Sequence, residues 1–266
     1  MFEILSSAFM QKALFVGIII SLISGLVSVF VVLRQMSFIG AGISHAAFGG
    51  VAIGFFTGIN PVITAIIYCI AVALGIELIS RKGKVSEDVS IGIFFASSMA
   101  LGIVLVSLSR EYNIDLFGYL FGNILAITDG EVLLSLSVAV LVIGVIILFL
   151  KEIYLTTYNE EIARVSGIPV RAINILFLLA LSVSIVISMK IVGIILISAL
   201  LVIPGATAQL FAKNLYLMIV TSCGVAVLST VLGLLISYEF DVAPGGSIVL
   251  TATALFLTAL LFKKKL

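Results

Sequence analysis

Charged residues are scarce in this chain. Asp, Glu, Lys and Arg make up 10% of its 266 residues, whereas about 25% is usual for a soluble domain. Apolar residues account for 62%, and the mean hydropathy is +1.39. These values exclude an ordinary soluble protein and indicate an integral membrane protein. The net charge of +1 gives no sign of a nucleic-acid partner, and we expect none.

Cysteine and histidine are almost absent. The two cysteines, Cys69 and Cys223, form no paired motif, so we expect them to pack inside the protein without forming a disulfide or a metal site. His45 is the single histidine, within a run of apolar and tiny residues. An ionisable group in a membrane span usually faces the bundle interior and marks a pathway for ions or protons. The alternative is a packing histidine bonded to a backbone carbonyl, and position alone does not separate the two.

Apolar runs recur along the whole chain, separated by short polar segments. A helix needs about 20 apolar residues to span a bilayer, and most runs reach that length. We therefore predict an all-α, polytopic helical membrane protein with eight or nine transmembrane helices, forming a single transmembrane domain over residues 1–266. The nine candidate spans cover residues 13–33, 41–58, 61–79, 89–109, 131–150, 172–189, 191–210, 215–237 and 246–262.

Three local features bear on how these nine candidate spans are arranged. Only Lys190 separates the sixth and seventh candidates, which predicts a tight hairpin there. Asp115–Thr128 is apolar but too short to span, so we expect it to be re-entrant or interfacial. Pro204 and Gly205 predict a kink or break in the seventh candidate, because proline lacks a backbone N–H. We expect that break and the His45 helix to border one translocation path; the alternative is a static kink without a transport role.

Basic residues indicate the orientation, because short loops rich in Lys and Arg stay in the cytoplasm. If Arg34 is inside, strict alternation of nine spans puts eleven of the fourteen basic residues inside. Only Lys12, Arg110 and Lys190 then lie outside. The pattern predicts an outside N-terminus and a cytoplasmic C-terminus.

The one sizeable polar loop, residues 151–171, is the expected docking place for a soluble partner. Thr157 and Glu160 have the spacing of a capping box, which predicts a cytoplasmic helix of about nine residues that starts there. Gly167 should end that helix, with Pro169 shortly beyond. The alternative is a plain connecting loop on the membrane surface.

Two catalytic motifs are missing from the sequence. No Gly-x-x-x-x-Gly-Lys-[Ser/Thr] phosphate loop occurs, so we expect that this chain is not an ATP-hydrolysing enzyme and that any energy from ATP comes from a partner chain. No Gly-x-Ser-x-Gly elbow occurs either. Ser44 and His45 are adjacent and would point about 100° apart on a helix, so they do not form a nucleophile and base pair.

Several motifs carry a resemblance to a known family. Glu160 to Pro169 resembles the Glu-Ala-Ala-x-x-x-Gly coupling loop of ABC importer permeases, with Ile162 in place of the first alanine. The other motifs are Leu33-Arg34-Gln35-Met36-Ser37, Ile43-Ser44-His45-Ala46, Glu87-Asp88-Val89-Ser90-Ile91-Gly92, Tyr119-Leu120-Phe121-Gly122-Asn123, Leu200-Leu201-Val202-Ile203-Pro204-Gly205-Ala206-Thr207-Ala208 and Asp241-Val242-Ala243-Pro244-Gly245-Gly246. In this order and spacing, they are similar to the permeases of zinc, manganese and iron ABC importers over essentially the whole chain.

This resemblance implies a homodimer in a prokaryotic cell membrane, two copies of a cytoplasmic ABC ATPase and an extracytoplasmic metal-binding protein. It implies alternating access, with a transported divalent metal ion and no permanently bound cofactor. The residues it assigns to ATPase coupling are Glu160, Glu161, Ala163, Arg164 and Gly167, and those we assign to the pathway hinge are Pro204 and Gly205.

The resemblance also implies a metal site in the membrane, formed in the family by an aspartate and a histidine four residues apart. Here the histidine is His45, but Ala41 stands at the aspartate position. Loss of the hard carboxylate favours zinc, with manganese and iron as alternatives. Asp241 and Asp115 are further candidates on the outer side, unless they are helix caps or solvated loop acids. A stand-alone secondary carrier or channel remains the alternative function, although the spans offer few polar coupling residues besides His45 and Glu77.

Overall fold

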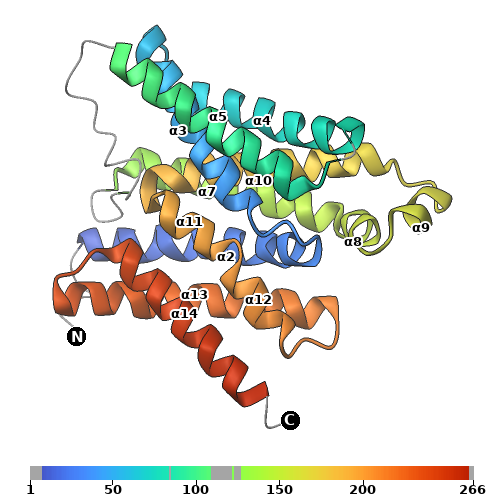
Figure 1. Cartoon of the computed structure of the whole chain (residues 1–266). Helices are drawn as coiled ribbons and strands as arrows, with labels where there is room; N and C mark the ends of the chain where they lie inside the picture. The colour runs from blue at the N-terminus through green and yellow to red at the C-terminus, as the bar shows by residue number, and fades with distance from the viewer. Residues whose placement is uncertain (1–7, 84, 109–121, 123–126, 264–266) are drawn as a thin grey trace.

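The computed structural model describes residues 8–83, 85–108, 122 and 127–263, and the regular elements within these ranges are all α-helices (Figure 1). The helices are α2 (Ala8–Leu33), α3 (Ile39–Thr57), α4 (Pro61–Gly83), α5 (Glu87–Leu108), α7 (Asp129–Leu148), α8 (Leu150–Tyr158), α9 (Glu160–Val165), α10 (Val170–Val192), α11 (Ile194–Leu200), α12 (Ile203–Gln209), α13 (Leu215–Phe240) and α14 (Pro244–Lys263). The predicted all-α class is confirmed.

Eight of the described helices are long and apolar enough to cross a membrane: α2, α3, α4, α5, α7, α10, α13 and α14. Their ends fall within a few residues of the predicted spans, because the length of an apolar run is set by the bilayer that it must cross. Helices α2, α3 and α10 are mostly buried within the chain, whereas α5, α7 and α14 expose most of their apolar surface.

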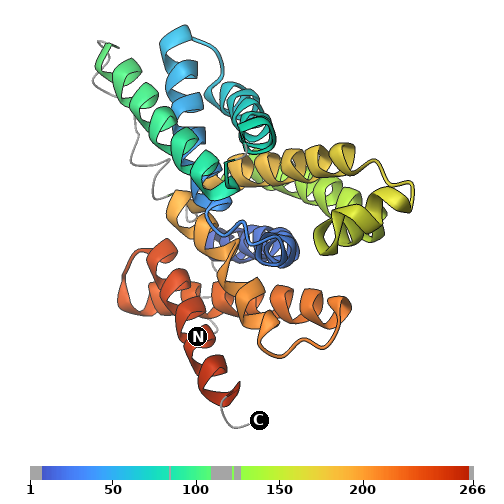
Figure 2. The ribbon, with the colours of Figure 1, turned by 45° about the vertical axis from the view of Figure 1, so that its right-hand side comes forward.

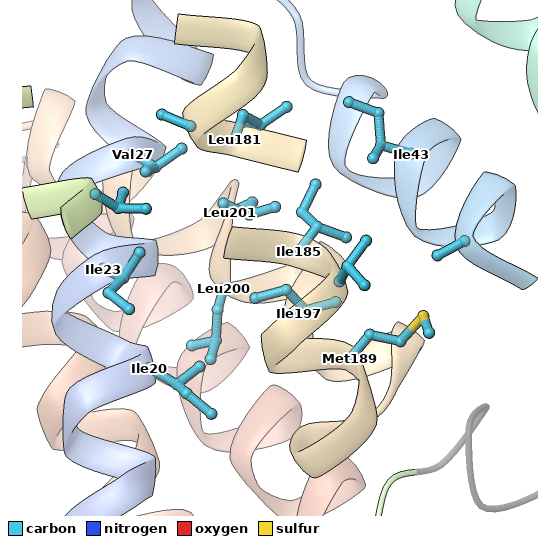
Figure 3. Close-up of a cluster of buried hydrophobic side chains, with 14 of the residues drawn as sticks. Ile20, Ile23, Val27, Ile43, Leu181, Ile185, Met189, Ile197, Leu200 and Leu201 are labelled. Atoms are coloured by element: carbon cyan, nitrogen blue, oxygen red, sulfur yellow. The ribbon is translucent and has the colours of Figure 1, made fainter. Parts of the chain in front are cut away.

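The long helices form two groups around α2 and α10 (Figures 1 and 2). Helix α3 packs extensively against α4 and α5 on one side. On the other, α2 packs against α12 and α13, and α13 packs against α14. Figure 3 shows the centre, where Ile23 and Val27 of α2, Ile185 of α10 and Ile197 of α11 lie in one buried cluster.

Glycine and serine let several helices approach closely, as expected of membrane helix interfaces. A Cβ at Gly25 of α2 would lie 2.8 Å from the Cα of Cys223, and the hydroxyl of Ser222 donates a hydrogen bond of 2.7 Å to the Gly25 carbonyl. A Cβ at Gly233 of α13 would lie 2.5 Å from the Cα of Ile248 in α14. Side chains at these positions would force the backbones apart.

The predicted seventh span is broken, as expected. Residues 194–209 form two short helices, α11 and α12, that are separated at Leu201 and Val202. The predicted break therefore exists, but it precedes Pro204, which lies in the first turn of α12 where its missing N–H costs no helical hydrogen bond.

The turn that was expected at Lys190 lies three residues later, at Gly193. Lys190 lies inside α10, and the chain turns at Gly193, whose φ of 87° is a conformation that suits glycine. The ammonium of Lys190 lies 2.8 Å from a carboxylate oxygen of Glu131 at the start of α7. At the same end of the bundle, Lys12 pairs with Asp129 at 2.6 Å. Two of the three basic residues that broke the orientation pattern thus have acidic partners.

The predicted re-entrant segment Asp115–Thr128 lies largely outside the described residues. Thr128 is the N-cap of α7, where it forms a capping box with Glu131. Gly122 is described as well, and a Cβ there would clash with the backbone of Val192 and Gly193. The chain therefore passes tightly over the turn between α10 and α11 at that point.

Candidate metal pathway and coupling helix

His45 lies on the open face of an otherwise buried stretch of α3. Between residues 39 and 52, every residue is buried except Ala41 and His45, which are half-buried and one turn apart. Residues four apart share a helix face. The structure thus places the single imidazole and the side chain of Ala41 on one partly accessible stripe of α3.

The imidazole has one aromatic neighbour and an unused nitrogen. Its ring packs against Phe95 of α5 with centroids 4.6 Å apart and the planes at 74°. Nδ1 of His45 is buried without a hydrogen-bond partner in the described part of the chain. The expected packing bond to a backbone carbonyl is therefore not seen at this nitrogen. A buried ring nitrogen that is not used in packing can act as a ligand.

Small residues hold α3 against its neighbours. A Cβ at Gly42 would lie 2.5 Å from the side chain of Ile91, and one at Gly49 would lie 2.8 Å from the Ser98 carbonyl, both in α5. A Cβ at Gly50 would lie 2.6 Å from the Cα of Ala65 in α4. These contacts fix how the His45 helix lies against α4 and α5.

The His45 helix also reaches the break in the seventh segment. A Cβ at Gly40 would lie 3.1 Å from the side chain of Leu201, the residue at which α11 ends. Beyond the break, the backbone N–H of Gly205 donates a 2.8 Å hydrogen bond to the Ser28 hydroxyl of α2. Pro204 and Gly205 are both buried. The predicted hinge residues thus lie at the start of α12, where Gly205 contacts α2. The break just before them, at Leu201, contacts α3.

Of the two acids proposed from the sequence, Asp241 is described, and the structure does not bring it to His45. Asp241 is exposed and caps the C-terminus of α13 in a left-handed conformation with a φ of 50°. Helix α13 does not pack extensively against α3. Asp115 lies outside the described residues. Across the described part of the chain, no group of three or more His, Cys, Asp or Glu side chains could hold a metal ion.

The short helix predicted in the loop of residues 151–171 is present, but it has fewer residues and a different N-cap than expected. Thr157 is not its N-cap, because α8 continues through Tyr158. Instead, the Asn159 side chain accepts hydrogen bonds from the backbone N–H groups of Glu161 and Ile162, and α9 has six residues. Gly167 follows with a φ of 79°, as expected of a helix C-terminal glycine. Helix α9 lies at the edge of the bundle, at the far right of Figure 1.

The faces of α9 differ in exposure. Ala163 is fully buried, which explains why a small residue stands there. Ile162 and Val165 are 51% and 91% exposed. Glu160 and Arg164 form an ion pair of 3.3 Å along the helix, and Glu161 is exposed. Exposed apolar side chains beside charged ones are typical of a surface that docks another protein.

The sequence analysis used Arg34 as a marker of orientation and as part of a family motif, but it missed the contacts of this side chain. Its guanidinium donates hydrogen bonds to Thr157 (2.9 Å), Asn174 (3.0 Å) and Thr156 (3.3 Å), and lies 4.5 Å from the ring centre of Phe177. These partners are more than a hundred residues away in the chain, so no local pattern could have identified them.

Burial and neighbouring acids shift the pKa of Arg34 in opposite directions. Removal from water lowers the pKa of the guanidinium to about 10, while the carboxylates of Glu87, Glu77 and Glu160 oppose this shift. A cavity of about 170 Å³ adjoins these groups and is lined by Arg34, the three acids, Met36, Thr156, Thr157, Asn174 and Leu178. The charge of Arg34 is therefore balanced by acids from α4, α5 and α9.

Comparison with known proteins agrees with this architecture. The Manganese transport system membrane protein MntC of Halalkalibacterium halodurans is 38% identical, with 99% of this chain and 90% of that protein covered. The High-affinity zinc uptake system membrane protein ZnuB of Haemophilus influenzae is 36% identical over 80% of each chain. The solved structure of PsaBC from Streptococcus pneumoniae in complex with Fab superposes with a TM-score of 0.86 at 38% identity, covering 97% of this chain and 93% of that one.

The model of the ABC 3 transport family matches residues 6–263, nearly the whole chain. The match confirms the resemblance inferred from the motifs. With its helical membrane architecture, this chain belongs to the ABC 3 transport family.

Proposed function

We propose that this chain is the permease subunit of an ATP-driven importer that carries divalent transition metal ions across a prokaryotic cell membrane. The observation that carries the proposal is the half-buried His45, whose Nδ1 has no partner in the described residues, on the partly accessible stripe of the otherwise buried residues 39–52 of α3. The names of the relatives, which refer to manganese and zinc transport, support the same class of cargo.

Zinc is the favoured cargo. An imidazole is a good ligand for zinc, whereas manganese prefers carboxylate and carbonyl oxygens. Ala41 supplies no oxygen beside His45. A single imidazole would hold the ion briefly and release it, which suits a stopping point on a pathway.

Manganese is the second candidate because of the relatives. The MntC protein of Halalkalibacterium halodurans and the Manganese import system permease protein ScaB of Streptococcus gordonii are 38% and 41% identical to this chain over 99% and 97% of it. A manganese pathway here would need oxygen ligands from elsewhere, such as Asp115 or Asp241. The two cargoes therefore predict different effects of substitutions at these acids.

ATP would act through partner proteins. The exposed Ile162 and Val165 of α9, with Glu160, Glu161 and Arg164, are suited to docking a cytoplasmic ABC ATPase. A second copy of this chain would cover apolar surface that the single chain leaves open, and an extracytoplasmic binding protein would deliver the metal at the opposite end. This arrangement puts α9 and the C-terminal Lys263 in the cytoplasm, since Arg34, Arg164 and Lys213 belong to the same side of the alternating series.

The test is metal uptake by the reconstituted complex. Proteoliposomes that hold this chain and its ATPase should take up zinc when ATP and the zinc-loaded binding protein are supplied, with manganese and iron as competitors. Uptake that persists without ATP and without the ATPase would support a secondary carrier instead. Preferential uptake of manganese would reject the zinc assignment and keep the permease assignment.

A further inference from the structure

We infer that Arg34 is a positioning residue that links the coupling helix α9 to the start of the His45 helix. This inference rests on the proposed function and deepens it, since it names the contacts through which a docked ATPase would act on the pathway. Arg34 is not proposed to touch the metal. Its role would be to pass a displacement of α9 to the turn between α2 and α3.

The first part of the link joins α2 to α8 and α10. Arg34 follows the last residue of α2, and its three guanidinium nitrogens each donate to a different side-chain oxygen. Two acceptors, Thr156 and Thr157, lie in the last turn of α8, and the third, Asn174, lies in the first turns of α10. A planar guanidinium that is held at three points fixes the relative positions of these helix ends.

The second part joins Asn174 to α9. The Asn174 side-chain amide accepts from Arg34 at its oxygen and donates to Glu160 at its nitrogen, over 3.2 Å. Glu160 is the first residue of α9 and also pairs with Arg164 one turn later. An unbroken series of polar contacts therefore runs from Arg34 through Asn174 to both ends of the six-residue coupling helix.

The third part is the short turn from Arg34 to α3. The backbone N–H groups of Arg34, Gln35 and Met36 donate to the carbonyls of Phe30, Val32 and Val31. Gln35 has a φ of 58°, in the left-handed region, and the Met36 side chain is buried. Helix α3 begins at Ile39, six residues before His45. A turn this short and this well bonded has little slack, so movement of Arg34 should reach α3.

The surroundings leave Arg34 room to move while keeping its charge balanced. The adjoining cavity of about 170 Å³ is lined by Glu77 of α4 and Glu87 of α5 as well as Glu160 of α9. Since a water molecule occupies about 30 Å³ of liquid, the space admits a change in side-chain position. Acids on three helices offer alternative partners for one guanidinium, which is a suitable basis for two discrete arrangements.

The test uses variants that keep a charge or a shape. Arg34→Lys retains the cation but loses the three-point fork, and Asn174→Leu removes both amide contacts at similar volume. In the reconstituted complex with its ATPase, each should lower the zinc transported per ATP hydrolysed by about tenfold, a usual size for coupling between sites. Because they break one series of contacts, the double variant should lose no more than the worse single variant. Lys12→Gln, which removes the cation at the other end of α2, is the matched control and should leave the ratio unchanged.

A second measurement does not depend on the cargo. A cysteine introduced by Ala41→Cys, in a chain with Cys69→Ala and Cys223→Ser, reports the accessibility of the His45 stripe to a soluble thiol reagent. Its labelling rate should change when the ATPase binds a non-hydrolysable ATP analogue, and Arg34→Lys should abolish that change. Circular dichroism and size-exclusion profiles establish that each variant is folded.

The outcomes distinguish the link through Arg34 from the proposed function. If the labelling change occurs and depends on Arg34 while no metal is taken up, the cargo assignment fails and the link stands. If the folded Arg34→Lys and Asn174→Leu variants keep normal labelling and a normal transport ratio, the link is overturned and the permease assignment stands. Multiplying losses in the double variant, or a labelling rate that nucleotide never changes, would also overturn the link.

Discussion

The backbone N–H of Gly205 in α12 donates a hydrogen bond of 2.8 Å to the hydroxyl of Ser28 in α2. A Cβ built on Gly205 would lie 2.5 Å from the Ser28 carbonyl oxygen and 2.6 Å from its hydroxyl oxygen. Two helices far apart in the sequence therefore meet here backbone to backbone, immediately after the break in the seventh segment.

Gly205→Ala should destabilise the protein, because neither backbone can yield without separating α12 from α2. Overpacking of this kind costs about 1–3 kcal/mol. Thermal unfolding in detergent should show a lower midpoint. Gly224→Ala in α13 is the matched control, since no atom lies within 4 Å of its added Cβ. Alanine there should be neutral or should stabilise the helix by roughly 0.5–1 kcal/mol. Equal midpoints for the two variants would contradict the observed packing.

Asn159→Ala should loosen the start of α9. The Asn159 side chain accepts from the N–H groups of Glu161 and Ile162 at 2.9 and 3.0 Å, and removal of such a cap costs about 1 kcal/mol. Hydrogen exchange at these two amides should speed up in Asn159→Ala and stay slow in Asn159→Asp, which keeps the acceptor. If Thr157→Val released these amides and Asn159→Ala did not, the cap predicted from the sequence would be the correct one.

Gly167→Ala should strain the exit from α9. Its φ of 79° costs a side-chain-bearing residue about 1–2 kcal/mol, and the space around the added Cβ is open, so strain is the only penalty. Transport per ATP should fall because α9 would no longer be held in place. Gly167→Asn should lose less, since asparagine enters the left-handed region more readily. Matching losses in both variants would point to a cause other than backbone strain.

His45→Ala should lower zinc uptake by at least about tenfold, the loss seen when even an outer partner of a metal ligand is removed. The variant should unfold at nearly the same temperature, because no hydrogen bond to Nδ1 is lost within the described residues. Normal uptake in His45→Ala would assign the imidazole to packing against Phe95.

Ala41→Asp should change which metal the pathway prefers. A carboxylate one turn before His45 would add a hard oxygen ligand on the same open stripe and shift preference towards manganese. Competition between zinc and manganese during uptake measures the shift. Ala41→Asn, with similar volume and no charge, is the control, and an equal shift in both variants would rule out the added charge as the cause.

Composition and motif order were enough to predict the helical class, nearly all span ends and the family, because lipid constrains long apolar runs strongly. Capping was harder to predict. Thr128 with Glu131 and Thr157 with Glu160 have the same Thr-x-x-Glu spacing, yet only the first pair forms a capping box. In the second, Thr157 remains helical and accepts a hydrogen bond from Arg34. A tertiary contact decided between two equivalent local patterns.

Contacts between distant parts of the chain also explain the other differences between the sequence-based predictions and the structure. Lys190 was interpreted as a polar loop residue, but its partner Glu131 lies 59 positions earlier and lets it remain in α10. Gly193, whose φ is 87°, is the local sequence signal for the turn after α10. The contacts of Arg34 could not have been identified from any sequence window, since its acceptors come from α8 and α10.

The close approach of α2 to α12 and α13 also restricts how this chain can be recombined with its relatives. At Gly25 and Gly205, each helix has been fitted to the bare backbone of its neighbour. A chimera that takes α2 from one permease and α12 or α13 from another would bring together helix surfaces that are not sterically complementary. Functional chimeras should therefore exchange these three helices as a block, with crossover points in the loops on the α3 to α5 side.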